Sequence, residues 1–496
     1  MHPFLPQPNI FRICIRSTIA SRTASSQDFH TNSRSTDRVP VSKMNTAVPH
    51  QKVRIVSSTA VKPSSPTPPH RRTLNLSLLD QLFPAGLPPT ILFYADPAAG
   101  GESLSHRMRA SLSETLTDFY PLAGRLRGSA CIDCNDEGAY WVEARADLPL
   151  ADVLARPDGT LLAQLLPSSH PETSLLAAMG CLLIVQITTF TCGGVAVAAC
   201  GTHKLLDASS LTFFLRSWSA RSAGRLEGGR PPPPRFLGDS LLRPKEVPFM
   251  LSDYAGMESC ATRRFVFHRS KISALKAEAV RAARPGESTR FTRVELVLAL
   301  IVRCALAASR SVTGSSRHPT LLRQMVNLRN RMSPALRDND VGNLAFGINI
   351  LYENSESTFH ELVSNIRKEM INFTKGAQAS GSDSGELLSI ACGSIGKAGD
   401  FFGKWKEESR FYRCSSLCGF RFYEVDFGSG KPAWVTCLSR AKNFVYMVDA
   451  KDGDGIDAWV TLDRRDMAVF ERDGELLAYA APNPSVAHHV MHPSRL

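Results

Sequence analysis

The chain has 496 residues and carries 58 Lys and Arg side chains against 46 Asp and Glu, a formal net charge of +12. Eleven of the basic and two of the acidic side chains lie in residues 1–75, which leaves the rest of the chain at only +3. Nucleic-acid binding needs basic side chains clustered on a folded face, so this distribution argues against that class of protein. Hydrophobic residues at 43% and charged residues at 21% are typical of a globular chain of two or three domains.

Residues 1–48 are expected to be a disordered leader. The segment is rich in Ser and Thr and contains five arginines, a composition shared by organellar transit peptides. Alternatively, Met44 is the working start and the preceding residues are an upstream extension. Twelve scattered cysteines indicate a reducing compartment and not a disulfide scaffold. We expect a cytoplasmic protein, or one of the plastid or mitochondrion if residues 1–43 are a transit peptide.

Residues 49–227 read as a first domain in which short strands alternate with amphipathic helices. Cys131 and Cys134 have C-x-x-C spacing, but they fall in a strand and turn without a following helix, which makes redox chemistry improbable. The apolar stretch from Cys181 to Cys200 is long enough to suggest a membrane span. Gln186 and the central Gly193-Gly194 divide it, so we predict a hairpin of buried strands and no membrane segment.

The predicted hairpin ends at Gly201-Thr202-His203, which places a histidine at a strand exit. An amphipathic helix follows, and Asp207 is a suitable N-cap for it. Because the pKa of imidazole lies near neutrality, His203 beside a cleft is a candidate general base. On spacing alone, a core histidine followed by a capping aspartate explains the pattern equally well. A metal site is disfavoured because no third ligand accompanies His203 and Asp207.

Residues 228–245 are rich in Gly and Pro and are predicted to be a crossover to a second domain at residues 246–490. In that domain, Thr292 and Glu295 form a capping-box pair ahead of a buried helix over residues 296–308. The spacing of apolar residues predicts another amphipathic helix over 359–370. Two strands are expected at 443–450 and 457–462.

The segment from Asp426 to Pro432 reads Asp-Phe-Gly-Ser-Gly-Lys-Pro. It lacks the upstream glycine and the final Ser or Thr of a phosphate-binding P-loop. From its residues alone we interpret it as a turn at a strand end. The nearby acidic loop beginning at Asp452 does not have the ligand pattern of an EF-hand.

Taken in order, these segments resemble the plant BAHD acyltransferases, which transfer acyl groups from coenzyme A thioesters. The H-x-x-x-D motif of that family appears as His203 to Asp207, and its D-F-G-W-G motif as Asp426, Phe427, Gly428 and Gly430 around Ser429. Further matches are Leu78-Leu79-Asp80-Gln81, the Tyr120 to Leu126 stretch, Val326 to Met332, Gly342-Asn343 and the Asp452 to Trp459 stretch. The resemblance covers about residue 50 to the end, and the alkaloid and alcohol acetyltransferase branch is most similar.

The resemblance implies a mixed α/β, two-domain fold similar to chloramphenicol acetyltransferase, with a solvent channel between the domains. It implies that His203 is the general base and that Asp207 is structural, with Arg329 as the candidate partner of Asp207. Ser415 is a candidate oxyanion donor, and Asp426 is expected to brace a turn remote from the chemistry. The expected ligands are an acyl-CoA co-substrate, most simply acetyl-CoA, and a small hydroxylated acceptor. No tightly bound cofactor, metal or membrane is expected, and the protein is expected to be a monomer.

The sequence departs from the family pattern at three positions. Ser429 replaces the tryptophan of D-F-G-W-G, Leu417 replaces a frequent tryptophan after a Ser-Ser pair, and Ala208 follows Asp207 where glycine is common. A noncatalytic member that binds metabolites or proteins is therefore the principal alternative. A hydroxycinnamoyl transferase or N-acyltransferase is the alternative within the family. For the coenzyme A phosphates, the sequence offers a basic cluster of Lys397, Lys404 and Lys406.

Overall fold

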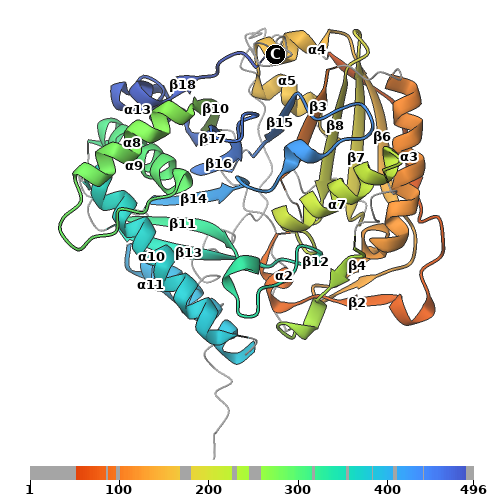
Figure 1. The fold of residues 1–496 in the computed structure, drawn as a ribbon, viewed down its shortest axis with the longest axis horizontal. Coiled ribbons are helices and arrows are strands. Elements are labelled where there is room, and N and C mark those ends of the chain that lie inside the picture. The colour runs from red at the N-terminus through yellow and green to blue at the C-terminus, as the bar shows by residue number, and fades with distance from the viewer. Residues whose placement is uncertain are drawn as a thin grey trace, which may run out of the picture.

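The computed structural model describes residues 52–84, 86, 88–95, 101–167, 180–225, 232–244, 259–314, 319–352, 357–381, 384–405, 410–439 and 441–486. The predicted leader lies outside these residues. The two largest β-sheets lie in separate halves of the molecule, each with helices on its outer side (Figure 1). The predicted mixed α/β class is therefore observed.

The first half is built on a six-stranded sheet. Its strand order is β1 (Val53–Val61), β6 (Ala139–Ala146), β7 (Leu183–Phe190), β8 (Val195–Gly201), β3 (Thr90–Tyr94) and β15 (Trp434–Cys437). Only β6 and β7 run parallel to each other. Strands β7 and β8 form the predicted hairpin, and most of their residues are buried because α3 (Gly101–Asp118) and α7 (Ala208–Ser222) cover the sheet.

Shorter elements complete this half. They are η1 (Pro69–Arg71), β2 (Thr73–Asn75), α2 (Leu78–Leu82), η2 (Tyr120–Ala123), β4 (Arg125–Arg127), β5 (Cys131–Asp133), α4 (Leu150–Ala155) and α5 (Gly159–Gln164). The crossover contains β9 (Arg235–Phe236) and η3 (Gly238–Ser240). Strand β9 pairs with β12 (Asp340–Val341) of the second half, so the crossover is anchored to both halves.

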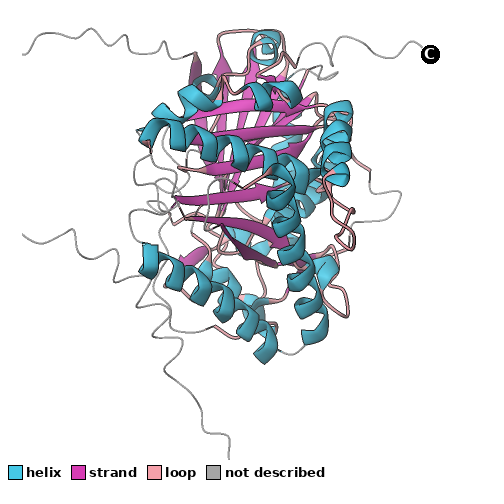
Figure 2. Cartoon of the chain, turned by 90° about the vertical axis from the view of Figure 1, so that its left-hand side faces the viewer, coloured by secondary structure: helices cyan, strands magenta, loops and turns pink. Residues whose placement is uncertain are grey.

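The second half is built on a seven-stranded sheet. Its order is β13 (Ala345–Tyr352), β11 (Thr320–Asn327), β14 (Arg410–Ser416), β16 (Phe444–Asp449), β17 (Ile456–Asp463), β10 (Cys260–Phe267) and β18 (Ala481–Pro482). Its helices are α8 (Arg269–Arg281), α9 (Arg293–Thr313), α10 (Phe359–Ser380), α11 (Ser384–Trp405), α12 (Arg464–Phe470) and α13 (Gly474–Tyr479), with η5 (Arg329–Arg331) and η7 (Phe422–Glu424) in the connections. Figure 2 shows helices lying across the strands of this half.

Helix α9 is the element that passes a test of length and hydropathy for a membrane span. In the most apolar part of the helix, 67% of the residues are buried inside the protein. Thr292 and Glu295 form the predicted capping box at its start, and Gly314 ends it in a left-handed conformation. The helix packs against α10 and α12, as expected for a core helix.

One strand departs from the predicted division into consecutive domains. β15 lies at residues 434–437, inside the predicted second domain, yet it pairs with β3 of the first sheet. Trp434 stacks on Phe93 with ring centroids 5.2 Å apart, and the amide of Ala433 donates to the carbonyl of Phe93. The exchange brings the loop before β15 against α7.

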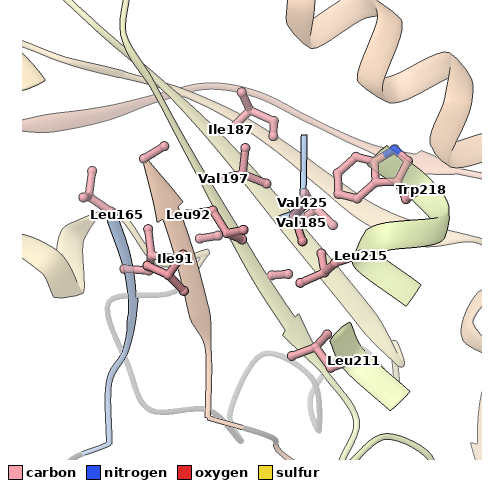
Figure 3. Close-up of a cluster of buried hydrophobic side chains, with 14 of the residues drawn as sticks. Ile91, Leu92, Leu165, Val185, Ile187, Val197, Leu211, Leu215, Trp218 and Val425 are labelled. Atoms are coloured by element: carbon pink, nitrogen blue, oxygen red, sulfur yellow. The ribbon is translucent and has the colours of Figure 1, made fainter. Parts of the chain in front are cut away.

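The core of the first half shows how α7 is held in place. Leu211, Leu215 and Trp218 recur at helical spacing and are buried against sheet residues such as Val185 and Val197 (Figure 3). The predicted N-cap is present, because the Asp207 carboxylate accepts a hydrogen bond from the Ser210 amide. The start of α7 is thereby fixed beside the end of β8.

Candidate active site

A cavity lies between the two halves and is lined by both. The first half contributes Phe83, His203 and Leu211 among others, and the second half contributes Met325, Ser415 and Leu417 among others. Sequence segments more than 200 residues apart therefore meet at this site. The arrangement matches the predicted position of a channel between two domains.

His203 lies in the turn between β8 and α7. The Thr202 amide donates to the Leu182 carbonyl at 2.7 Å, and the Leu206 amide donates to the Thr202 carbonyl, so the turn is tied on both sides of the histidine. The Phe83 ring lies over the imidazole with centroids 4.4 Å apart. These contacts restrict the imidazole to one orientation at the cavity wall.

Asn343 determines which nitrogen of His203 carries the proton. Its side-chain amide nitrogen donates to the His203 carbonyl at 2.6 Å and to Asp80 Oδ1 at 3.0 Å. Both partners are acceptors, so Asn343 Oδ1 must be the acceptor that faces His203 Nδ1 at 2.9 Å. The proton of the neutral imidazole therefore lies on Nδ1, and Nε2 keeps the lone pair that a general base requires.

Burial lowers the pKa of His203 to about 4. The charge of Asp207 and the hydrogen bond to Asn343 oppose this effect and do not reverse it. At neutral pH the imidazole is therefore uncharged and able to accept a proton.

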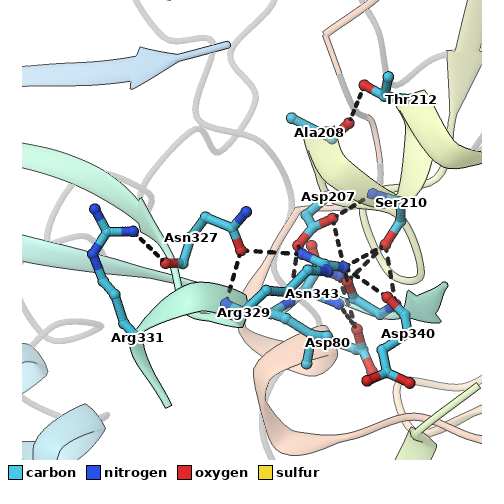
Figure 4. A network of polar contacts seen from close by, with 12 residues as sticks. Asp80, Asp207, Ala208, Ser210, Thr212, Asn327, Arg329, Arg331, Asp340 and Asn343 are labelled. Atoms are coloured by element: carbon cyan, nitrogen blue, oxygen red, sulfur yellow. Dashed lines mark hydrogen bonds and ion pairs between the residues drawn. The ribbon is translucent and has the colours of Figure 1, made fainter. Parts of the chain in front are cut away.

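Asp207 and Arg329 form the predicted ion pair (Figure 4). Arg329 Nη1 lies 2.7 Å from Asp207 Oδ2, and Nη2 lies 3.2 Å from Oδ1, which is the bidentate geometry of a strong pair. Both side chains are buried, at 2% exposure for Arg329 and 5% for Asp207. Arg329 Nη2 also donates to Ser210 Oγ and to the Asp340 carbonyl, so the pair joins α7 to β12.

The carboxylate oxygens of Asp207 are fully used by protein groups. Besides Arg329, Oδ1 accepts from the Ser210 amide and Oδ2 from the Leu344 amide. Burial alone would raise the pKa of Asp207, but the charge and hydrogen bonds of Arg329 outweigh it and the pKa is lowered. The residue does line the cavity, yet both of its oxygens are engaged in this network.

Sequence reasoning assigned no role to Asp80 and Asn343, although both fall in segments that match the family. Asp80 is held by a capping box in which Ser77 is the N-cap of α2, and its other oxygen accepts from the amide of Asn343 at 2.7 Å. A chain of contacts therefore runs from α2 through Asn343 to His203. The match to the family motifs was the sequence feature that could have indicated these two residues. They are 263 residues apart, so no local sequence pattern predicts their contact.

Lys204 follows the histidine and is fully buried. Its Nζ donates to the Gln81 carbonyl at 2.9 Å. Burial lowers its pKa to about 8, and the negative charge of Asp80 opposes that shift. Lys204 thus places positive charge beside the carboxylate that holds Asn343.

Ser415 lines the same cavity as His203. It is the penultimate residue of β14 and pairs with Tyr446 of β16, which also lines the cavity. Within the described residues its hydroxyl has no hydrogen-bond partner. The predicted oxyanion donor therefore lies in the same cavity as the predicted base. Leu417, where the family often has tryptophan, is a buried part of the same wall.

Asp426 braces a loop that does not contribute to the cavity, as predicted. Its carboxylate accepts from the Gly428 amide at 2.8 Å and pairs with Arg225 at 2.5 Å. Phe427 is buried and meets Trp218 edge to face, with centroids 4.6 Å apart. Gly428 and Gly430 have φ angles of 92° and 87°, in the region that favours glycine. The loop leads into β15, whereas the sequence suggested a turn at a strand end.

Ser429 in this loop offers a test of the departure from the family pattern. Its Oγ is buried without a hydrogen-bond partner in the described part of the chain. Ser429→Ala should therefore leave the melting temperature unchanged or raise it, because a buried unpaired hydroxyl costs ~1–3 kcal/mol. Ser429→Trp should be tolerated or stabilising, since exposed glycines flank the position. Marked destabilisation by Trp alone, measured by thermal unfolding, would show that the surroundings have repacked around the small side chain.

The remaining thiols and acidic groups have structural environments. Cys131 lies in β5 and Cys134 follows it, and burial raises the pKa of the Cys134 thiol to about 12, which keeps it protonated. Elsewhere Cys304, Asp473 and Glu475 hold possible ligand atoms within 4.8 Å of one another. Asp473 caps α13, Glu475 pairs with Arg303, and burial raises the pKa of the Cys304 thiol. We assign no metal to this group.

The predicted basic cluster falls on α11. Lys397 and Lys404 belong to this helix, and Lys406 lies outside the described residues. Lys404 is exposed, and its ammonium lies 4.6 Å from the centre of the Trp405 ring. Neither lysine is among the residues that line the cavity.

Comparison with known proteins relates this architecture to a family. A model described as the transferase family matches residues 51–477. Akuammiline synthase 1 from Alstonia scholaris is 36% identical over 433 residues, covering 86% of this chain and 97% of the relative. BAHD acyltransferase BIA1 from Arabidopsis thaliana is 37% identical over 455 residues, covering 88% of this chain and 99% of the relative.

A solved structure confirms the predicted fold. The crystal structure of vinorine synthase superimposes with a TM-score of 0.74 at 30% identity, covering 88% of this chain and all of that one. TRI101 of F. graminearum, at 16% identity and a TM-score of 0.63, shares the fold. The match to the transferase family spans most of the chain, and relatives over 30% identical are covered almost completely. The chain therefore belongs to the BAHD acyltransferases and is an enzyme that transfers acyl groups.

Proposed function

We propose that this enzyme transfers an acyl group from an acyl-CoA, most simply acetyl-CoA, to a hydroxyl of a small specialised metabolite. Relatives named as limonoid O-acetyltransferases from Citrus sinensis are 31% and 33% identical to this chain. The fold neighbour TRI101 has been crystallised with coenzyme A and a small-molecule acceptor. These relatives support the reaction class, and the geometry around His203 supports the mechanism.

In the proposed reaction, His203 Nε2 accepts the proton of the acceptor hydroxyl as its oxygen attacks the thioester carbonyl. A tetrahedral intermediate forms whose oxyanion is stabilised by a donor, for which Ser415 is placed in the cavity wall. The intermediate collapses as the carbon–sulfur bond breaks. The coenzyme A thiolate leaves and takes the proton from the imidazolium. No acyl-enzyme forms in this scheme.

The observation that carries the proposal is the hydrogen bond between His203 Nδ1 and Asn343 Oδ1. It fixes the tautomer in which Nε2 is the base, and Asp80 fixes Asn343 in turn. A core histidine without a catalytic role has no need of this chain of fully buried orienting groups. The arrangement therefore favours catalysis over the noncatalytic alternative suggested by Leu417 and Ser429.

Release of free thiol tests the proposal directly. Purified protein is incubated with acetyl-CoA, malonyl-CoA or a hydroxycinnamoyl-CoA and a panel of alcohols and amines, with mass detection of products. We expect thiol release that depends on an alcohol and matches ester formation mole for mole. Absence of thiol release across the panel would support a noncatalytic binding protein, and amide products alone would support N-acyl transfer.

We also propose that the enzyme works as a monomer in a reducing compartment. All eleven cysteines in the described part of the chain are free thiols, which is compatible with a reducing compartment. The compartment is the cytoplasm, or the plastid or mitochondrion if residues 1–43 are a transit peptide.

A further inference from the structure

Two arginines lie on the sheet of the second half, each two residues from a residue that lines the cavity, although neither arginine is itself a lining residue. Arg323 of β11 comes two residues before Met325, which lines the cavity. Residues two apart on a strand face the same side and lie about 7 Å apart. Arg413 of β14 is the register partner of Arg323, and Ser415, two residues after it, also lines the cavity. The two arginines therefore share the sheet face that continues into the cavity wall.

The guanidinium of Arg323 leans along the sheet toward the cavity. It lies so close to Gly347 of β13 that a Cβ there would meet Arg323 Nε at 2.2 Å and Nη2 at 3.0 Å. Gly347 is the register partner of Met325, whereas the partner of Arg323 is Asn349. The side chain therefore reaches back to the level of a cavity residue, and the missing side chain of Gly347 leaves space for it.

The described residues contain no counter-charge for Arg323. Within the described residues its guanidinium makes no hydrogen bond or ion pair. Burial lowers the pKa of Arg323, and the positive charge of Arg413 lowers it further. Arg323 is partly buried, arginine stays charged in proteins, and a charge held partly out of water without a partner is costly. Arg413 itself lies between the rings of Phe411 and Phe444, at 5.7 and 5.3 Å from their centres.

We propose that Arg323 recognises a carboxylate of the substrate bound in the cavity with His203. A guanidinium binds carboxylates in a bidentate manner, and the anion would supply the counter-charge that the described residues do not supply. The inference rests on the proposed acyl transfer and narrows its substrate class. The carboxylate belongs either to a dicarboxylic acyl group, as in malonyl-CoA, or to the acceptor. The coenzyme A phosphates are a poorer fit, because the pantetheine arm separates them from a thioester placed at His203.

Paired substrates distinguish the two sources of the carboxylate. In the donor arm, malonyl-CoA is compared with acetyl-CoA, with benzyl alcohol as acceptor. In the acceptor arm, 4-(hydroxymethyl)benzoate is compared with its methyl ester, with acetyl-CoA as donor. In one of the two arms, Arg323→Met should lower the ratio of kcat/KM for the anionic to the neutral substrate at least tenfold, and Arg323→Lys should lower it less. The exposed Arg281 of α8 provides the matched control, Arg281→Met, which should leave both ratios unchanged.

A binding measurement decides the proposal independently of turnover. At constant ionic strength, malonate should raise the melting temperature of the wild-type protein and of Arg281→Met relative to chloride, and it should not raise that of Arg323→Met. Without malonate, Arg323→Met should be as stable as wild type or more stable, because an unpaired charge is removed. If Arg323→Met keeps both the substrate ratio and the malonate shift, or if wild type shows neither, the assignment is wrong. Absence of thiol release with every donor would refute the proposed transfer, while the malonate shift would still decide the role of Arg323.

Discussion

His203→Ala should reduce the rate of thiol release ~10²–10⁴-fold while leaving the fold intact, because a positioned general base contributes about that factor. The measurement is kcat/KM with a saturating acyl-CoA, accompanied by circular dichroism and thermal unfolding. The exposed His106 on α3 provides the control, since His106→Ala alters the same residue type away from the cavity. Near-normal turnover in His203→Ala would remove the imidazole as the base.

The pH dependence of the wild-type enzyme gives this prediction a second readout. The pKa of His203 is lowered to about 4, so the base form persists well below neutrality. We expect kcat/KM to be level from pH 7 to about pH 5 and to fall as the pH drops through 4, in the range where the protein stays folded. An acid limb near pH 6.5, the ordinary value for histidine, would contradict the buried neutral imidazole.

The lowered pKa of His203 also determines how the free energy of unfolding changes with pH. In the unfolded chain His203 titrates near pH 6.5, so below that pH the unfolded state binds a proton that the folded state refuses until about pH 4. The free energy of unfolding should therefore fall as the pH drops from 6.5 to 4, by up to ~3 kcal/mol from this one residue. His203→Ala should show a correspondingly weaker loss over that interval.

Asp207→Ala should destabilise the protein by ~3–5 kcal/mol, the typical result of leaving one member of a buried ion pair without its partner. The substitution leaves Arg329 charged at 2% exposure and removes the N-cap of α7 and the acceptor of the Leu344 amide. Activity should fall as well, because the start of α7 follows directly on the turn that holds His203. Urea unfolding and thiol release measure the two effects.

Two variants separate the causes of the Asp207 effect. Asp207→Asn keeps an acceptor for the helix N-terminus and loses the charge, so its loss of stability should be smaller. Asp454→Ala breaks an exposed pair with Arg269, whose side chains are 54% and 75% exposed, and should cost less than 1 kcal/mol. A defect in rate alone for Asp207→Ala, at unchanged stability, would argue against a bracing role for the ion pair with Arg329.

Local sequence patterns predicted the elements that carry the site. Gly193-Gly194 inside an apolar stretch indicated the β7–β8 hairpin, and the apolar spacing after Asp207 indicated α7 with its cap. Each of these features depends on residues within a few positions of one another, which is why periodicity and capping rules detect them. The pairing of Asp207 with Arg329 came instead from the family resemblance.

The contacts that orient His203 had no local signature. Asp80 and Asn343 are 263 residues apart, and each has ordinary neighbours in sequence. The same is true of β15, whose four residues are as apolar as those of any buried strand. Which sheet a strand joins is decided by long-range packing, here of Trp434 on Phe93. The environment of Arg323 could not be predicted from the sequence either. Whether it has a charged partner depends on which side chains from other elements reach its guanidinium.

The exchange of β15 limits how the enzyme can move. A hinge that opened the cavity by separating the two halves would have to strip β15 from β3 along Thr90–Phe93, and β9 from β12. Such a motion would also have to break a third link between the halves, the hydrogen bond from the Val486 amide to the Leu154 carbonyl. We therefore expect substrates and products to pass without separation of the two halves. The rate of product release is then expected to depend on cavity side chains such as Phe83 and Leu417, and not on a hinge motion of the halves.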